Sequence, residues 1–248
     1  MTTKRQRKGK TTETESGISR LIVGQDDWHT FKSEKNSPQI FMTDGPFGVN
    51  TASHHRPRQT LTTAFPSGVN LASTWNVELV LRTASAVAEE TKEIGANMIL
   101  GPCIDIIRHP LQGRSFEAMS EDPCLTSKLA IAFVSGTHRI KGIGNCLKHF
   151  ACYNQETERT QYNAIVSERA LREIHLAAFE SAISSENVDA VMTSYNLVNS
   201  APSSSNFHLI GEILRCEWKF RGLLVSDWGG CPYLGKSLLA GLSLKMPG

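Results

Sequence analysis

Short apolar segments alternate with helical segments along most of this chain, and this alternation constrains the fold more than any other feature. The apolar segments read as strands, at residues 38–45, 96–103, 145–152, 189–196, 222–229 and 242–248. The segments between them read as helices, at residues 76–95, 125–140, 166–183, 207–218 and 233–242. Repeated strand–helix units of this kind predict a parallel sheet covered by helices.

Two α/β architectures compete for such a pattern, an open doubly wound sheet and a (β/α)8 barrel. The G-x-G-x-x-G fingerprint of a dinucleotide fold does not follow the first strand. Polar residues recur instead where strands end, at Asp44, Lys148-His149, Tyr195-Asn196 and Asp227-Trp228. In a barrel these ends converge on the face that carries the active site, so we predict a TIM-barrel type of fold.

The predicted barrel is short of strands. Six strands are predicted, whereas a closed barrel of this type uses eight. We therefore expect a barrel that is incomplete at its C-terminus, near Gly248, with an open sheet edge and exposed apolar surface.

Composition excludes several function classes. The chain has 248 residues, 40% of them hydrophobic, and a net charge of +2, which predicts neither a nucleic-acid nor a membrane partner. Basic residues cluster once, at positions 4–10, inside a polar stretch at residues 1–20 that we predict to be a disordered leader. This start has no apolar core like that of a secretory signal, so the expected location is cytoplasmic. The six cysteines form no C-x-x-C pair and are expected to be buried free thiols.

Eight sequence blocks resemble, in order, those of the glycoside hydrolase family 3 N-terminal domain, in its β-glucosidase branch. The blocks are "TDGPFGV", "AFPSGVNLASTWN", "NMILGPCIDIIRHPLQGRSFEAMSEDP", "KHFACYNQETERT", "VSERALREIHLAAFE", "VMTSYNLVN", "LRCEWKFRGLLVSDWG" and "AGLSLKMPG". Each block alone is weak, but eight in the same order with sensible spacing form a specific signal. The resemblance implies a barrel domain at residues 21–248, without the second α/β sandwich domain of that branch.

The resemblance also implies an activity and a site. It suggests a retaining hydrolase of terminal non-reducing β-D-glucosyl residues, with Asp227 as the nucleophile. Trp228 would form an apolar wall for the sugar ring. The residues expected at the sugar are Asp44, Arg114, Lys148, His149, Met192 and Tyr195. Carboxylate, guanidinium, ammonium and imidazole groups are charge-assisted partners for sugar hydroxyls, which both donate and accept.

Structural interpretations compete with these roles. An Asp at a strand end is usually a turn or cap residue, although the motif around Asp227 favours a nucleophile. Lys148 is hard to explain as a core residue, because lysine is rarely buried unpaired. Arg114 could instead brace a loop by pairing with Glu117 or Asp122.

The sequence departs from the family pattern in two informative places. The terminal block usually reads "AGLDLEMPG", whereas Ser243 and Lys245 replace its acidic residues here. A retaining glycosidase also needs a second carboxyl group about 5–5.5 Å from the nucleophile. In the β-glucosidase branch that acid lies on the following domain, and the "KHFPGHG" loop of another branch is replaced here by residues 148–152. No acid/base residue can therefore be assigned.

Two functions remain open on this sequence. The first is a β-glucosidase-type hydrolase that binds a β-glucoside or oligosaccharide and is completed by a C-terminal domain or a homo-oligomer. The alternative is a non-catalytic carbohydrate-binding or decayed homologue. We expect no cofactor and no metal, since His149 alone qualifies as a strand-end metal ligand.

Overall fold

The structure, a computed structural model, describes residues 20–32, 39–51 and 61–248. Residues 1–19 of the predicted leader lie outside this range, so the predicted disorder and the domain boundary after residue 20 stay predictions. No helix in the described ranges is both long and apolar enough to cross a membrane.

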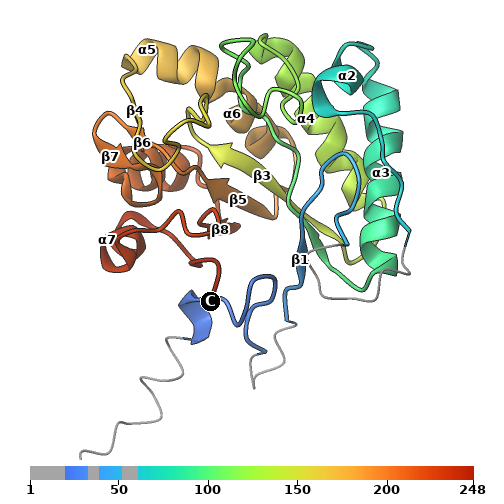
Figure 1. Cartoon of the computed structure of the whole chain (residues 1–248), viewed down its shortest axis with the longest axis horizontal. Helices are drawn as coiled ribbons and strands as arrows, with labels where there is room; N and C mark the ends of the chain where they lie inside the picture. The colour runs from blue at the N-terminus through green and yellow to red at the C-terminus, as the bar shows by residue number, and fades with distance from the viewer. Residues whose placement is uncertain (1–19, 33–38, 52–60) are drawn as a thin grey trace, which may run out of the picture.

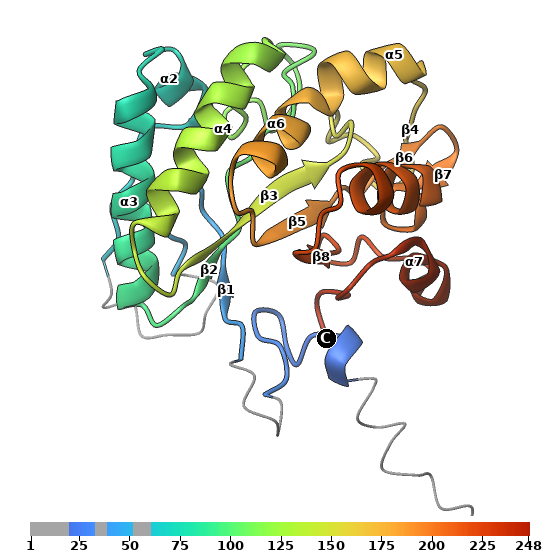
Figure 2. The same ribbon diagram turned by 180° about the vertical axis from the view of Figure 1, so that it is seen from behind.

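A parallel five-stranded sheet forms the centre of the described chain (Figures 1 and 2). Its order is β1 (Met42–Thr43), β2 (Met98–Ile99), β3 (Gly144–Phe150), β5 (Ala190–Thr193) and β8 (Leu223–Val225). Every neighbouring pair runs parallel, as the strand–helix alternation predicted. A small second sheet holds β4 (Asn163–Ala164), β6 (Leu197–Val198) and β7 (Ala201–Pro202).

Helices cover the outer face of the central sheet. The longer ones are α3 (Val77–Glu93), α4 (Pro123–His138), α6 (Ala177–Ser185) and the π-helical η4 (His208–Glu217). Shorter ones are α2 (Gly68–Ala72), α5 (Glu168–Ala170), the π-helical η2 (Leu171–His175), the 3-10 turn η3 (Ser203–Ser205) and α7 (Leu234–Ala240). Side-chain caps define the starts of the two longest helices, because Asn76 accepts from the Leu79 N–H and Asp122 from the Cys124 N–H.

The predicted helix at 166–183 is interrupted. Ser167 caps its start by accepting a hydrogen bond from the Ala170 N–H. The backbone then passes through the π-helical turn η2 before α6 begins at Ala177. Hydrophobic spacing did not reveal this break, since a π turn changes the hydrogen-bond pattern with little effect on which face is apolar.

Two apolar clusters form the core. The larger lies between the sheet and the helices and includes Phe133, Phe150 and Phe179. The smaller is rich in methionine and packs around the strands at Met42, Met98, Met192 and Met246, together with Leu100, Cys146, Ala190, Val225 and Leu244. Four cysteines are buried as expected, but Cys124 and Cys216 are exposed.

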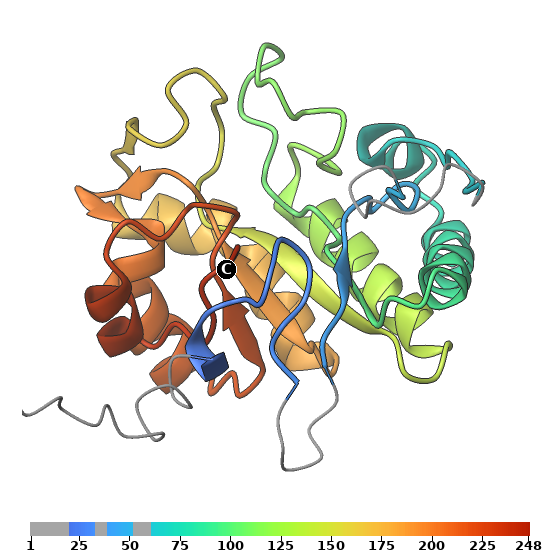
Figure 3. The ribbon, with the colours of Figure 1, turned by 60° about the horizontal axis from the view of Figure 1, so that its bottom comes forward.

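The N-terminal and C-terminal segments add isolated backbone pairs beside the two edge strands of the sheet. Beyond β8, Leu244 pairs in parallel with Val225, and Lys245 then pairs in parallel with Val23. A few residues later the same N-terminal segment pairs His29 with Phe41, directly before β1. Figure 3 shows this segment in blue, between the C-terminus and β1.

The predicted barrel type of fold is confirmed. The predicted shortage of strands is confirmed as well, since the described sheet has five strands whereas a closed barrel of this type has eight. The expected open edge beside β8 is wrong. There the Gly24 N–H donates to the Lys245 carbonyl at 3.0 Å, and the Lys245 N–H donates to Ile22 at 2.8 Å. Backbone groups that an edge strand would leave exposed are therefore paired.

Candidate active site

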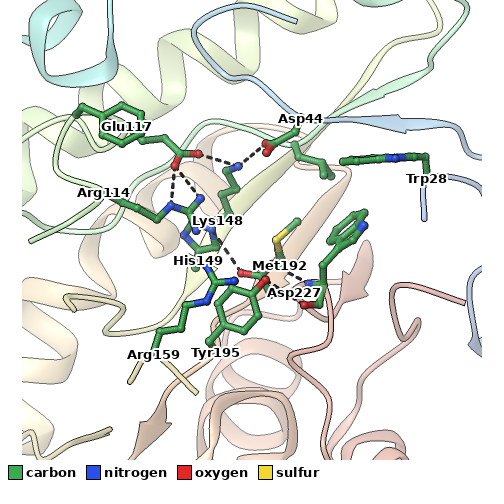
Figure 4. Close-up of a pocket in the computed structure, with 13 residues that line it drawn as sticks. Trp28, Asp44, Arg114, Glu117, Lys148, His149, Arg159, Met192, Tyr195 and Asp227 are labelled. Atoms are coloured by element: carbon green, nitrogen blue, oxygen red, sulfur yellow. Dashed lines mark hydrogen bonds and ion pairs between the residues drawn. The ribbon is translucent and has the colours of Figure 1, made fainter. Parts of the chain in front are cut away.

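One pocket of about 400 Å³ lies where the strands of the sheet end (Figure 4). It is lined by all eight residues singled out in the sequence: Asp44, Arg114, Lys148, His149, Met192, Tyr195, Asp227 and Trp228. Because the strands are parallel, the residues at their carboxyl ends meet at one edge of the sheet.

Lys148 sits between two carboxylates. Its Nζ lies 2.7 Å from Asp44 Oδ1 and 2.8 Å from Glu117 Oε1. Arg114 donates to the other carboxylate oxygen of Glu117, Oε2, from Nε at 2.8 Å and from Nη2 at 2.7 Å. The bracing pair proposed for Arg114 therefore exists, and the same arginine also lines the pocket.

Burial and charge compete in setting the pKa values of this cluster. Burial raises the pKa of Glu117, but Lys148 and Arg114 lower it by more, so the net pKa falls below its ordinary value. Asp44 follows the same pattern, with Lys148 providing the main lowering of its pKa. Both carboxyls are therefore ionised partners of the two cations.

Asp227 is held differently. Its Oδ1 accepts the Trp228 backbone N–H at 2.7 Å. Its Oδ2 is buried and has no hydrogen-bond partner among the described residues. Burial raises the pKa of Asp227 above its ordinary value, and the Trp228 N–H, Arg114 and Lys148 oppose only part of this rise. A buried, unpartnered carboxylate oxygen is costly, and such atoms gather where ligands bind.

His149 lies between two aspartates. Its Nδ1 is 2.7 Å from Oδ2 of the buried Asp105, and its Nε2 is 3.6 Å from Asp227 Oδ2. Burial lowers the pKa of His149 well below its ordinary value, and Arg114 and Lys148 lower it further. The imidazole is therefore neutral, and the charge-assisted bonds expected of it from sequence are not available.

Aromatic side chains form one wall of the pocket. The rings of Trp28 and Trp228 lie with their centroids 5.4 Å apart, and the Trp228 indole N–H donates to the Asp27 carbonyl at 2.6 Å. The Tyr195 hydroxyl donates to the Trp228 carbonyl at 3.0 Å. The guanidinium of Arg159 lies 4.2 Å from the centre of the Tyr195 ring. The segment before β1 therefore helps to build the site.

Sequence reasoning missed part of this lining. The residues it did not select are Trp28, Leu100, Phe116, Glu117 and Arg159. Glu117 had a usable signal, because it was already named as the partner of Arg114. Trp28 had none, since it lies in an irregular segment that long-range contacts bring to the pocket, among them the backbone pairs of Val23 with Lys245 and of His29 with Phe41.

Cys103, Asp105 and His149 form a buried cluster whose ligand-type atoms lie within 4.8 Å of one another. These atoms already bond each other, with Cys103 Sγ 3.4 Å and His149 Nδ1 2.7 Å from the same Asp105 oxygen. Burial raises the pKa of Cys103 well above its ordinary value, so its thiol is protonated and donates to Asp105. We interpret the cluster as a hydrogen-bond network.

Comparisons with known proteins agree on one family. The family model described as the glycosyl hydrolase family 3 N-terminal domain matches residues 18–237. Beta-glucosidase B of Emericella nidulans is 43% identical over 92% of this chain and 27% of its own length. An exo-alpha-(1->6)-L-arabinopyranosidase of Bifidobacterium longum is 42% identical over 92% of this chain and 31% of its own length.

Solved structures give the same result. A GH3 beta-glucosidase of Bifidobacterium adolescentis superposes with a TM-score of 0.88 at 40% identity, over 96% of this chain and 34% of that one. Beta-glucosidase 3B of Thermotoga neapolitana in complex with glucose also gives 0.88, at 38% identity, over 96% of this chain and 35% of that one. The chain thus spans only about a third of these relatives. On these grounds it belongs to glycosyl hydrolase family 3 and carries the N-terminal domain of that family.

Proposed function

We propose that this chain is the sugar-binding and nucleophile-bearing part of a retaining glycoside hydrolase of β-glucosidase type. Its substrates would be terminal non-reducing β-D-glucosyl residues of glucosides or oligosaccharides. The observation that carries the proposal is the buried, unpartnered Oδ2 of Asp227 in a pocket that also holds Lys148 and Arg114. The names of the beta-glucosidase relatives support it.

In this proposal Asp227 Oδ2 attacks the anomeric carbon while the bond to the leaving oxygen breaks. The product is a glycosyl ester on the enzyme, which water then hydrolyses. The Trp228 N–H holds Oδ1, so that Oδ2 is the oxygen free to react. Arg114 and Lys148 favour the ionised form of Asp227, and burial makes that carboxylate more basic.

The remaining residues would bind the sugar. Lys148 and Arg114 are donors for hydroxyl oxygens, and Asp44 is an acceptor with 42% of its side chain exposed. Met192 and Trp228 supply apolar surface against the ring, and Tyr195 supports Trp228 through its carbonyl. Ion pairs already made within the pocket hold these groups in place before a sugar arrives, which is the arrangement expected of a preorganised site.

The general acid is not assigned among the pocket-lining carboxyls of the described residues. Besides Asp227 these are Asp44 and Glu117. Both bond Lys148, and both have pKa values below the ordinary range, whereas an acid needs a raised pKa to keep its proton. We propose that the acid comes from outside the described residues, on a following α/β domain as the family resemblance implies.

A labelling experiment tests the nucleophile. A dinitrophenyl 2-deoxy-2-fluoro-glucoside has a leaving group that needs little protonation, so it should label Asp227 without the acid. Mass spectrometry after proteolysis should find one 2-deoxy-2-fluoroglucosyl ester, on Asp227. Asp227→Asn should abolish the label and keep glucose binding, because an amide is a far poorer nucleophile. Asp189→Asn, a change at the opposite end of β5, should label like wild type.

The outcomes separate the two candidate functions. Label on another residue, or equal labelling of wild type and Asp227→Asn, would refute the nucleophile. Glucose binding without any labelling would favour the non-catalytic carbohydrate-binding homologue.

A further inference from the structure

Three potential donors converge on one oxygen of Asp105. This residue is 4% exposed and lies in the loop after β2. Its Oδ2 lies 3.0 Å from the His149 backbone nitrogen and 2.7 Å from His149 Nδ1. The thiol of Cys103 lies 3.4 Å from the same oxygen. Asp105 itself does not line the pocket.

This convergence decides the tautomer of His149. The backbone N–H can only donate, and the protonated thiol of Cys103 donates as well, so Oδ2 of Asp105 is an acceptor. A neutral imidazole carries one proton, and the acceptor at 2.7 Å draws it to Nδ1. Nε2 then bears a lone pair, and it lies 3.6 Å from Asp227 Oδ2 in the pocket.

We propose that Asp105 is a positioning residue, which holds His149 as the Nδ1–H tautomer and presents Nε2 as an acceptor for one sugar hydroxyl. The identity of the ligand rests on the proposed function above, whereas the tautomer does not. Asp105 acts through His149 and touches no substrate. Its arrangement is that of a carboxylate that fixes which ring nitrogen is free.

The arrangement implies a pH dependence. Burial raises the pKa of Asp105 to about 7, and the His149 N–H and Arg114 oppose part of this rise. Charged and titratable groups facing Asp105 are Arg114, Glu117, Cys103, Cys152 and Tyr162. Those facing His149 are Arg114, Lys148, Arg159, Tyr153 and Asp227. Arg114, Lys148 and Arg159 all lower the pKa of the His149 imidazole, so the proton taken up in acid resides on Asp105.

Above the transition Asp105 is ionised, and the imidazole carries its one proton on Nδ1. Below it Asp105 is protonated and donates to Nδ1, and the imidazole proton is on Nε2 instead. The Asp105–His149 pair therefore gains one proton in total. Nε2 is thus an acceptor above a pH of about 7 and a donor below it. The sugar hydroxyl must reverse its own hydrogen bond at the same pH.

Nitrogen NMR of the imidazole reads the tautomer directly and needs no sugar. In histidine-labelled wild type, His149 Nε2 should be unprotonated at pH 8.5 and protonated at pH 5.5, with a midpoint of about 7. Comparison with His149→Gln assigns the signal. Asp105→Asn should keep the Nδ1–H tautomer at both pH values, because the amide does not titrate. Its oxygen must accept from the His149 backbone N–H, so the same oxygen also accepts from Nδ1–H.

Two further variants sharpen the test. Cys103→Ser replaces a weak donor with a stronger one, so the midpoint should move to lower pH. Asp189→Asn alters a separate carboxylate–histidine pair, with His138 at 2.8 Å, and should leave the His149 titration unchanged. A protonated Nε2 at pH 8.5, or the same titration in wild type and Asp105→Asn, would overturn the proposal.

A glucose titration at pH 8.5 separates this inference from the proposed function. The unprotonated Nε2 signal should shift as glucose donates a hydroxyl proton to it. If the tautomer is as predicted but glucose leaves Nε2 unchanged, the role of Asp105 stands and the sugar ligand is refuted.

Discussion

The ammonium group of Lys148 lies 2.7 Å from Oδ1 of Asp44, a residue 104 positions earlier in the chain. Asp44 follows β1 and Lys148 belongs to β3, with β2 between them in the sheet. The Lys148 side chain is 3% exposed, so Asp44 and Glu117 rather than water compensate the charge of its ammonium group. Removing one member of a buried charge cluster leaves an uncompensated charge and is strongly destabilising.

Glu117→Gln should destabilise the protein by about 3 kcal/mol at pH 7, because Lys148 and Arg114 lose their shared counter-ion. The pKa of Glu117 is lowered on folding, so its contribution is complete above the ordinary glutamate pKa of about 4.3 and is lost as pH falls through the folded value. Urea unfolding should show that the difference in unfolding free energy between wild type and Glu117→Gln is smaller in mild acid than at pH 7.

The matched control for this change is Glu173→Gln. Glu173 pairs with Arg169 at 3.0 Å, but the side chains are 62% and 84% exposed. Exposed pairs contribute roughly 0–1 kcal/mol, so this variant should unfold close to wild type. Equal losses in the two variants would contradict the argument from burial.

Trp28→Ala should weaken sugar binding while leaving the fold intact. Trp28 packs against Trp228 at 5.4 Å and lines the pocket. An aromatic pair contributes about 0.5–1.5 kcal/mol, so glucoside binding should fall roughly 2- to 10-fold if Trp228 loses its support. Isothermal titration with a glucoside measures this directly.

Trp75→Ala is the control for Trp28→Ala. Trp75 is 71% exposed and lines a different cavity, so its loss should leave affinity unchanged. Unchanged affinity in Trp28→Ala as well would show that Trp228 keeps its position without Trp28.

Ser243→Asp should stabilise the protein. Ser243 Oγ accepts from Arg215 at 3.0 Å and from the Leu224 N–H at 3.2 Å. A carboxylate here, as in the related family block, would make both bonds charge-assisted, for a gain of about 1 kcal/mol. The melting temperature should rise by about 2–4 °C at neutral pH, and the gain should disappear once the new carboxyl is protonated.

A double-mutant cycle isolates the partner in this last prediction. Arg215 also donates to the carbonyls of Phe220, Gly222 and Gly241, so Arg215→Met will itself be destabilising. What matters is whether Ser243→Asp still stabilises the Arg215→Met protein. A gain of the same size there would show that the benefit does not come from Arg215.

The sequence located Asp44, Lys148, His149 and Asp227 together because periodicity and chain order contain enough information to do so. A strand shows as an apolar run, and parallel pairing sends the residues after each run to one edge of the sheet. The order of the strands alone sets this placement, and side-chain coordinates add nothing to it. It explains why the residues at the strand ends line one pocket, whereas Arg114 and Met192, which line it too, were expected there from the family resemblance.

The sequence by itself therefore determined the barrel type and the residues placed at the strand ends. Only the tertiary structure decided what depends on irregular backbone and on the environment of each charge. Trp28 reaches the pocket because Val23 pairs with Lys245 and His29 with Phe41, contacts that no local pattern encodes. His149 is neutral and Asp227 has a raised pKa because both are buried, and burial is a property of the assembled core rather than of a residue's neighbours in the chain.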